Sequence, residues 1–220
     1  MLGAAAVAIW CEVEPGIRGE FDDWHTHEHM PERLGIPGFL RGSRWVGDGY
    51  FILYEVETPA TLTSKPYLAR LNDPTPWSRK MMQQHLGMVR SLCAVRSTFG
   101  AGFADAMLTI RFSPRLEAAE SLIQWLSAEA LPKLPTRRGL VGAHLLQNAA
   151  TTQAAPTTEQ KIRGSDKAAD WVVLVNGYGA HAVGRLAGEE LNEAALVAHG
   201  AVPGSIARVY RLAYTLAIPP

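Results

Sequence analysis

Three of the seven histidines of this 220-residue chain lie within five residues, in the segment HTHEH at positions 25–29. An imidazole changes its protonation state near neutral pH, so such a cluster suits either proton transfer or metal binding. Residues three and four apart share one face of a helix. One stripe would then hold His25, Glu28, His29 and Glu32. The spacing is compatible with an acid–base centre, a metal site or a solvated helix face.

The stripe also matches H-x-x-E-H, the pattern with which inverted zinc peptidases bind a metal and place a catalytic glutamate. Pro31 follows His29 by only two residues, so the helix must end soon, and no acidic motif downstream stands out as a third ligand. These features disfavour a zinc peptidase. A looser site, in which His25 and His29 bind a divalent metal beside a carboxylate, stays open.

The second half of the chain contains a weak copy of this region. The segment WHTHEHMPERLGIPGFL (24–40) aligns without a gap with WLSAEALPKLPTRRGLV (125–141). Trp24, Glu28 and Pro31 each meet an identical residue. The three histidines meet Leu126, Ala128 and Ala130. We therefore expect the shared residues to serve the fold and the histidines to serve a site that only the first half carries.

Composition limits the partners of the protein. Hydrophobic residues make up 47% and charged residues 19%, and the formal net charge is +0. Without a basic patch, neither nucleic acid nor an anionic membrane surface is an expected partner. Cys11 and Cys93 lie in apolar segments, which indicates buried free thiols and a reducing compartment. The apolar start MLGAAAVAIW lacks a basic flank, so we expect a buried strand and a cytoplasmic protein.

The apolar periodicity and the turn residues predict an α+β fold. Each half should run strand, helix, strand, strand, helix, strand, the ferredoxin-like βαββαβ plait with an antiparallel sheet. Strands are expected at 5–13, 39–46, 50–57, 89–99, 104–113, 140–147, 170–176 and 206–216. Helices are expected at 19–33, 59–72, 76–86, 116–131 and 184–198. His85 would then end a helix, where a cation meets the negative end of the helix dipole.

Two domains follow from the repeat. We expect a first ferredoxin-like repeat over 1–100, which carries the site, and a second, degenerate repeat over 101–220. Residues 148–170 are rich in small polar residues and lack apolar periodicity, which predicts a mobile insertion that is either a disordered surface loop or a lid.

The string W…EHMPERLGIPGF, followed by RGSRW and YFILYEVE, resembles the dimeric α/β-barrel superfamily, including its EthD-like, muconolactone-isomerase-like and antibiotic-biosynthesis-monooxygenase-like members. The resemblance covers the first half through Trp24, His29, Pro31 and 37–39, and is only architectural in the second. It implies antiparallel sheets that line a barrel with helices outside, built here by the two halves of one chain. It also implies a pocket between sheet and helices, and makes His29 the foremost candidate among the histidines.

The expected function is that of a small-molecule enzyme without an organic cofactor. His29 would be the general base, oriented by Glu28 or His25, and Arg44 or Tyr54 would stabilise oxyanion charge. An isomerase, dehydratase or other lyase acting on an aromatic or carbonyl-containing substrate would suit these groups. The aromatic side chains that could bind such a substrate are Trp10, Trp24, Tyr67 and Trp77.

Two other classes of function stay open. One is an oxygenase-type enzyme in which His25 and His29 hold a divalent metal, or His29 ligates haem. The other is a non-catalytic ligand-binding or accessory protein. A homodimer is possible in addition to the pseudo-dimer formed by the two halves.

Overall fold

A computed structural model describes residues 1–149, 156–164 and 167–218. The chain divides into two compact units. The N-unit comprises Leu2–Ala94, Ala149–Ala168 and Ala213–Pro220, and the C-unit comprises Met1, Val95–Asn148 and Ala169–Leu212. Two long strands, β4 (His85–Phe99) and β8 (Ile206–Ala217), each contribute residues to both units.

The N-unit sheet is antiparallel. It contains β1 (Ala5–Val13), β2 (Phe39–Val46) and β3 (Tyr50–Val56), together with parts of β4 and β8. Strand β1 pairs with both β3 and β4, and β3 pairs with β2. Every residue of β3 is buried, as its apolar run YFILYEV leads one to expect for a central strand.

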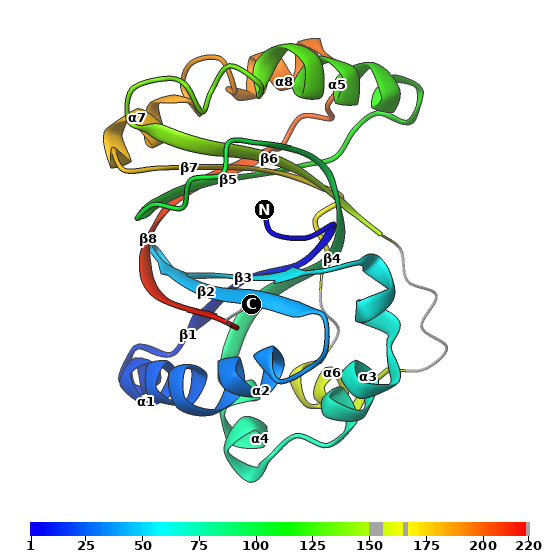
Figure 1. The fold of residues 1–220 in the computed structure, drawn as a ribbon, viewed down its shortest axis with the longest axis vertical. Coiled ribbons are helices and arrows are strands. Elements are labelled where there is room, and N and C mark those ends of the chain that lie inside the picture. Colours follow the sequence, from blue (N-terminus) through cyan, green and yellow to red (C-terminus); the bar gives the residue numbers. More distant parts are fainter. Residues whose placement is uncertain (150–155, 165–166, 219–220) are drawn as a thin grey trace. The chain divides into compact units, whose positions relative to one another are not determined.

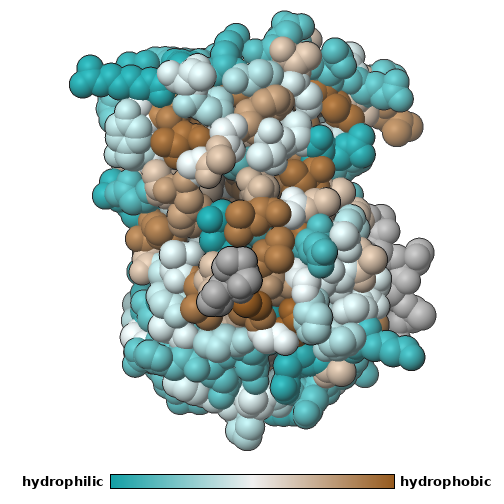
Figure 2. All heavy atoms as spheres, viewed as in Figure 1, coloured by the Kyte–Doolittle hydropathy of each residue, from teal (hydrophilic) through white to brown (hydrophobic). Residues whose placement is uncertain are grey.

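The helices of the N-unit lie on one face of its sheet (Figure 1). They are η1 (Pro15–Ile17), α1 (Arg18–Trp24), η2 (His25–His29), α2 (Met30–Leu34), η3 (Pro59–Thr63), α3 (Lys65–Asn72), α4 (Pro76–Met82) and α6 (Thr158–Arg163). The Ser64 and Thr75 side chains cap α3 and α4. Each accepts a hydrogen bond from the backbone N–H of the third residue of its helix. The outer surface of α1, α2 and α4 is mainly hydrophilic (Figure 2).

The C-unit repeats this plan. Its strands are β5 (Ala106–Phe112), β6 (Leu140–Asn148) and β7 (Trp171–Gly177). Strand β7 pairs antiparallel with β5 and β6, and β5 also pairs antiparallel with β8. Its helices are η4 (Leu116–Ala118), α5 (Ala119–Trp125), η5 (Leu126–Ala130), α7 (Ala180–Arg185) and α8 (Glu193–Ala198). They too lie on one face of their sheet (Figure 1).

The predicted fold class is confirmed. The strands hydrogen-bond in the order β1-β3-β2-β8-β5-β7-β6-β4, which returns to β1 and is the topology of a dimeric α/β barrel built from two ferredoxin-like halves. Three helix predictions need correction. The helix expected over 59–72 is divided into η3 and α3 by Ser64, which has an extended backbone. The helix expected over 184–198 is two short helices, α7 and α8, and the helix expected over 76–86 ends at Met82, so His85 begins a strand.

The weak sequence repeat corresponds to matched local structure. Both halves contain a five-residue π-helical turn, His25–His29 and Leu126–Ala130, at the positions that the alignment pairs. Both also place a glycine with a positive φ angle before the second strand, Gly38 at +89° and Gly139 at +90°. The π-helical turn is therefore part of the repeated scaffold.

The expectation of an irregular insertion over 148–170 was wrong for part of that segment. Helix α6 lies within it and begins with a capping box, in which Thr157 and Gln160 exchange hydrogen bonds. The sequence signal was the TTEQ motif that precedes this short helix. Glu159 of α6 is buried, and α6 belongs to the N-unit rather than to the C-unit that surrounds it in sequence. Residues 150–155 and 165–166 lie outside the described residues.

Within the described part of the chain, no helix is both long enough and apolar enough to cross a membrane.

We expect Gly38→Ala to destabilise the protein by about 1–3 kcal/mol, because an alanine at a positive φ angle is strained and its Cβ would lie 2.7 Å from the Thr61 hydroxyl oxygen. Gly19→Ala is the matched control. Gly19 lies in α1 with no atom within 4 Å of an added Cβ, and alanine there should stabilise by about 0.5–1 kcal/mol. Urea unfolding measures both values, and equal effects would contradict the assignment of Gly38 to a strained turn.

Candidate functional site

Two adjoining cavities lie between the sheet and the helices of the N-unit. Both are lined by Ile9, His29, Tyr54, Arg90 and Arg163. The first cavity is further lined by Trp24, His25, Ile52, Met82, His85 and Met88. The second cavity is further lined by Val7, Arg33, Phe39, Tyr67, Leu71 and Glu159. His29 therefore lies where the two cavities meet.

The π-helical turn brings His25 and His29 to the same cavity. Their ring centroids are 5.8 Å apart, and both side chains are buried. The turn closes with a hydrogen bond from the Met30 N–H to the His25 carbonyl, one residue wider than an α-helical turn. In the C-unit the matching residues, Leu126 and Ala130, belong to the apolar core. The same backbone thus places imidazoles in one half and hydrocarbon in the other.

His29 is a buried histidine packed against Trp24. Its side chain is 9% exposed, and its ring lies 4.4 Å from that of Trp24. Its Nδ1 atom is buried and has no hydrogen-bond partner among the described residues. Burial, followed by the positive charge of Arg33, holds the pKa of His29 well below its ordinary value of 6.5. The imidazole is therefore neutral at neutral pH, and one of its ring nitrogens carries no proton.

His25 contacts Tyr54 rather than His29. The His25 Nε2 atom lies 3.1 Å from the Tyr54 hydroxyl, and its Nδ1 atom lies 3.4 Å from Nη1 of Arg44. A guanidinium has only donors, so the favoured tautomer of His25 turns an unprotonated Nδ1 toward Arg44 and carries its proton on Nε2. In this tautomer His25 donates to the Tyr54 oxygen, and the Tyr54 hydroxyl hydrogen is left for another acceptor.

Tyr54 lines both cavities and stays protonated, because burial raises the pKa of its phenol far above the ordinary value of 10.0. A neutral phenol at a cavity wall is a hydrogen-bond donor suited to a carbonyl oxygen or an enolate.

Arg44 holds His25 in place but does not line either cavity. Its Nη1 atom donates to the Asp22 carbonyl and to the Thr26 hydroxyl, both at 3.0 Å. Its guanidinium also lies over the Tyr214 ring, 5.7 Å from the centroid. We expected Arg44 to contact substrate charge directly. Arg44 instead contacts His25, which lines the first cavity.

The structure does not place Glu28 beside His29, contrary to our expectation. The Glu28 Oε1 atom accepts from Trp24 Nε1 at 3.2 Å, from the Thr75 hydroxyl at 2.6 Å and from the Ser78 hydroxyl at 3.1 Å. The widened helical turn rotates Glu28 away from the histidine face and toward the start of α4. Its role is to join α1 and η2 to α4.

Of the four aromatic residues expected to bind substrate, Trp24 and Tyr67 line the cavities and Trp10 and Trp77 do not. Successive residues of a strand point to opposite faces, so Trp10 faces away from the cavity wall that its neighbour Ile9 forms, and it stacks on Phe51 at 5.1 Å. Trp77 is partly exposed on α4, where its indole donates to Glu20.

Sequence reasoning missed five charged or titratable residues that line the cavities: Arg33, His85, Arg90, Glu159 and Arg163. His85 was assigned to a helix end, yet it begins β4 and its Nδ1 atom lies 3.2 Å from the carbonyl of Met82, the last residue of α4. Glu159 and Arg163 come from the segment expected to be irregular. The signal in the sequence was that Glu159 and Arg163 are four residues apart after the TTEQ cap, which would place both on one face of a helix.

The donor set does not suit a metal ion held by His25 and His29. No group of three or more His, Cys, Asp or Glu side chains able to hold a metal occurs among residues 1–149, 156–164 and 167–218. Both ring nitrogens of His25 face other groups, the Tyr54 hydroxyl and the Arg44 guanidinium. Metal binding would require His25 to leave both contacts.

We expect Glu28→Ala to lower the free energy of unfolding by about 1–3 kcal/mol, because Trp24, Thr75 and Ser78 would lose a shared acceptor. Glu129→Ala, at the matching and exposed position of the C-unit, should stay within about 0.5 kcal/mol of wild type. Chemical denaturation of both variants checks this, and similar losses would refute the role assigned to Glu28.

No protein-family model matches the chain, and neither does any curated protein. Solved structures do. An anthrone oxidase-like protein matches with a TM-score of 0.64 and 10% identity, over 97% of this chain and 92% of its own. Monooxygenase-like proteins from Fusobacterium nucleatum (TM-score 0.62, 7% identity, 99% and 96% covered) and Lactobacillus acidophilus (0.57, 10%, 97% and 95%) also match. The chain has the dimeric α/β-barrel fold that these proteins share.

Proposed function

We propose that the protein is a small-molecule enzyme in which His29 removes a proton from a carbon next to a carbonyl group of the substrate. The observation that carries this proposal is the buried, neutral His29 ring at the junction of two cavities. Its Nδ1 atom has no hydrogen-bond partner among the described residues. A base of this kind needs no organic cofactor when the substrate is already activated by its carbonyl.

Tyr54 is the proposed partner of His29. The hydroxyl hydrogen of Tyr54 would donate to the substrate oxygen as negative charge develops there, while His25 and Arg44 hold that hydroxyl in orientation. Trp24, Ile52 and Met88 supply an apolar wall that suits an aromatic or alicyclic substrate. Proton return at a second carbon would complete an isomerisation, and loss of a leaving group would complete an elimination.

An oxygen-using reaction is the second candidate. Its support is that the similar structures include an anthrone oxidase-like protein and monooxygenase-like proteins. An anthrone is an aromatic ketone with an acidic carbon, so its oxidation can begin with the same proton removal. If the protein consumes O₂ when it is mixed with an anthrone or a phenol that carries a carbonyl group, an oxygen-using reaction would be favoured over isomerisation or elimination.

A metal- or haem-dependent enzyme and a ligand-binding protein without catalysis are the remaining alternatives. Elemental analysis and an absorption spectrum of protein purified without chelator test the first. A stoichiometric metal or a Soret band that disappears in His25→Ala/His29→Ala would overturn the cofactor-free proposal. Binding of a carbonyl ligand without any proton exchange or turnover would favour the second alternative. Light scattering would show whether two chains associate.

We expect His29→Gln to slow exchange of the acidic C–H of anthrone or a cyclic β-keto ester into D₂O by about 100- to 10,000-fold, since this is the typical contribution of a positioned base. Exchange is followed by NMR and needs no knowledge of the natural product. The exposed neighbour His27, changed to Gln, is the control and should exchange at the wild-type rate. Unchanged exchange in His29→Gln would end the proposal.

The free energy of unfolding should fall as the pH drops below about 6.5, the ordinary pKa of histidine. Burial keeps His25 and His29 neutral in the folded protein, so the unfolded chain binds more protons below that pH and is favoured. Each histidine can contribute a slope of up to about 1.4 kcal/mol per pH unit. Urea titrations at pH 7.5, 6.5 and 5.5 should give a shallower slope in His29→Gln, and an identical slope would show that His29 protonates freely in the folded state.

A further inference from the structure

The second cavity is rich in arginine. Arg33 from α2, Arg90 from β4 and Arg163 from α6 all line it, and Glu159 is the one carboxylate among its lining residues. Arg33 is 4% exposed and Glu159 is 2% exposed, so the positive and negative groups both lie out of water. Arginine stays charged at any ordinary pH.

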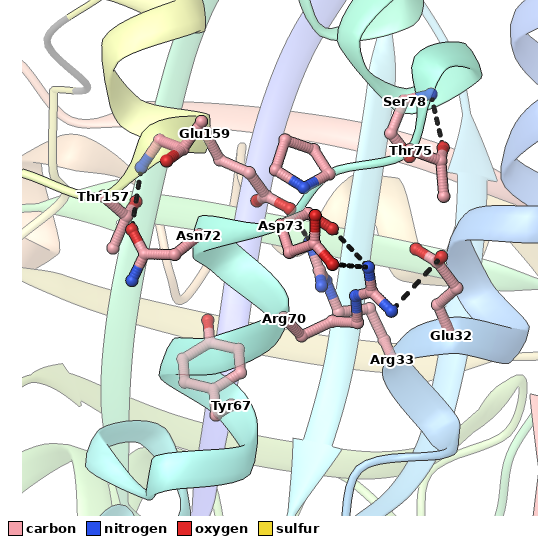
Figure 3. A network of polar contacts seen from close by, with 12 residues as sticks. Glu32, Arg33, Tyr67, Arg70, Asn72, Asp73, Thr75, Ser78, Thr157 and Glu159 are labelled. Atoms are coloured by element: carbon pink, nitrogen blue, oxygen red, sulfur yellow. Dashed lines mark hydrogen bonds and ion pairs between the residues drawn. The ribbon is translucent and has the colours of Figure 1, made fainter.

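Both carboxylate oxygens of Glu159 accept hydrogen bonds from two of these arginines. Its Oε1 atom accepts from Nη2 of Arg33, and its Oε2 atom accepts from Nη1 of Arg163 at 3.2 Å. In Figure 3, Glu159 extends from α6 toward Arg33, with Tyr67 and Asn72 of α3 nearby. Asn72 in turn accepts from the backbone N–H of Thr158, which ties α6 to α3. The acidic side chain is thus fixed from both sides and holds Arg33 in one position.

Arg33 and Arg90 can each form further hydrogen bonds or ion pairs. Nη1 of Arg33 is buried and has no hydrogen-bond partner among the described residues. Arg90 donates to the hydroxyl of Tyr67, a neutral group, and forms no ion pair with a carboxylate in the described part of the chain. Arg33 and Arg163 both pair with Glu159, and Arg90 is half-buried, so three guanidinium groups and a single carboxylate line this cavity. A lining with this composition is complementary to an anion.

We propose that the second cavity binds a carboxylate group of the substrate through Arg33 and Arg90, with Glu159 as the internal counter-ion that positions Arg33. This inference rests on the proposed function, because it places the reacting carbon at His29, where the two cavities meet, and the apolar body of the substrate in the first cavity. The planar, forked guanidinium matches a carboxylate with two parallel hydrogen bonds. The substrate class is therefore an aromatic or alicyclic keto acid or lactone acid.

Isothermal titration with 2-naphthoate and its neutral isostere 2-naphthamide tests this without any turnover. The wild-type protein should bind the carboxylate about 10-fold or more tightly than the amide, the value of one good charged hydrogen-bond pair. Arg90→Gln should abolish that preference. Arg90→Lys keeps the positive charge but loses the forked guanidinium, and it should retain part of the preference for the carboxylate.

Arg70→Gln is the matched control, because Arg70 lies outside both cavities in weak ion pairs with Glu32 and Asp73 at 3.9 and 3.8 Å. It should keep the full preference for the carboxylate. Equal binding of acid and amide by the wild type, no measurable binding of either, or an unchanged preference in Arg90→Gln would each overturn the proposal. These outcomes leave the deuterium exchange by His29 untouched, so failure of the subsite and failure of the base are separate results.

Discussion

The cost of removing polar groups from water governs the site of this protein. The N-unit buries two histidines, Tyr54, Glu159 and two arginines under its helices, where each must find a partner or change its charge. Two kinds of arrangement occur. His25 shares a hydrogen bond with Tyr54, and Arg33 pairs with Glu159. His29 instead remains neutral, so a ring nitrogen without a proton lies at the wall of both cavities.

The C-unit shows what the same scaffold does without a site. Its π-helical turn has the same length and place as that of the N-unit, but Leu126 and Ala130 pack into an apolar core where His25 and His29 line a cavity. The turn itself is therefore not evidence of function, although π-helical turns often occur at functional sites. The function depends on the side chains placed on it, and only one half of the chain carries them.

Helix α6 belongs to a different unit from the strands that flank it in sequence, which the duplication does not require. In sequence it interrupts the second repeat between β6 and β7, yet it packs in the N-unit and supplies Glu159 and Arg163 to the second cavity. A segment of one repeat thus completes the cavity of the other. Since fold alone does not determine chemistry, such additions to a common scaffold are the natural place for a substrate preference to arise.

The sequence by itself determined the fold class, most element boundaries, the duplication and the helical placement of HTHEH. These depend on local signals: alternating apolar residues in strands, capping residues and proline at helix starts, and a glycine with positive φ before the second strand. Local signals could not decide which way Glu28 points, because a single extra residue in the helical turn rotates it toward α4. Nor could they show that Arg44 reaches His25, or that Arg33 meets a glutamate more than a hundred residues away. Those contacts depend on the packing of helices against the sheet, which only the tertiary structure decides.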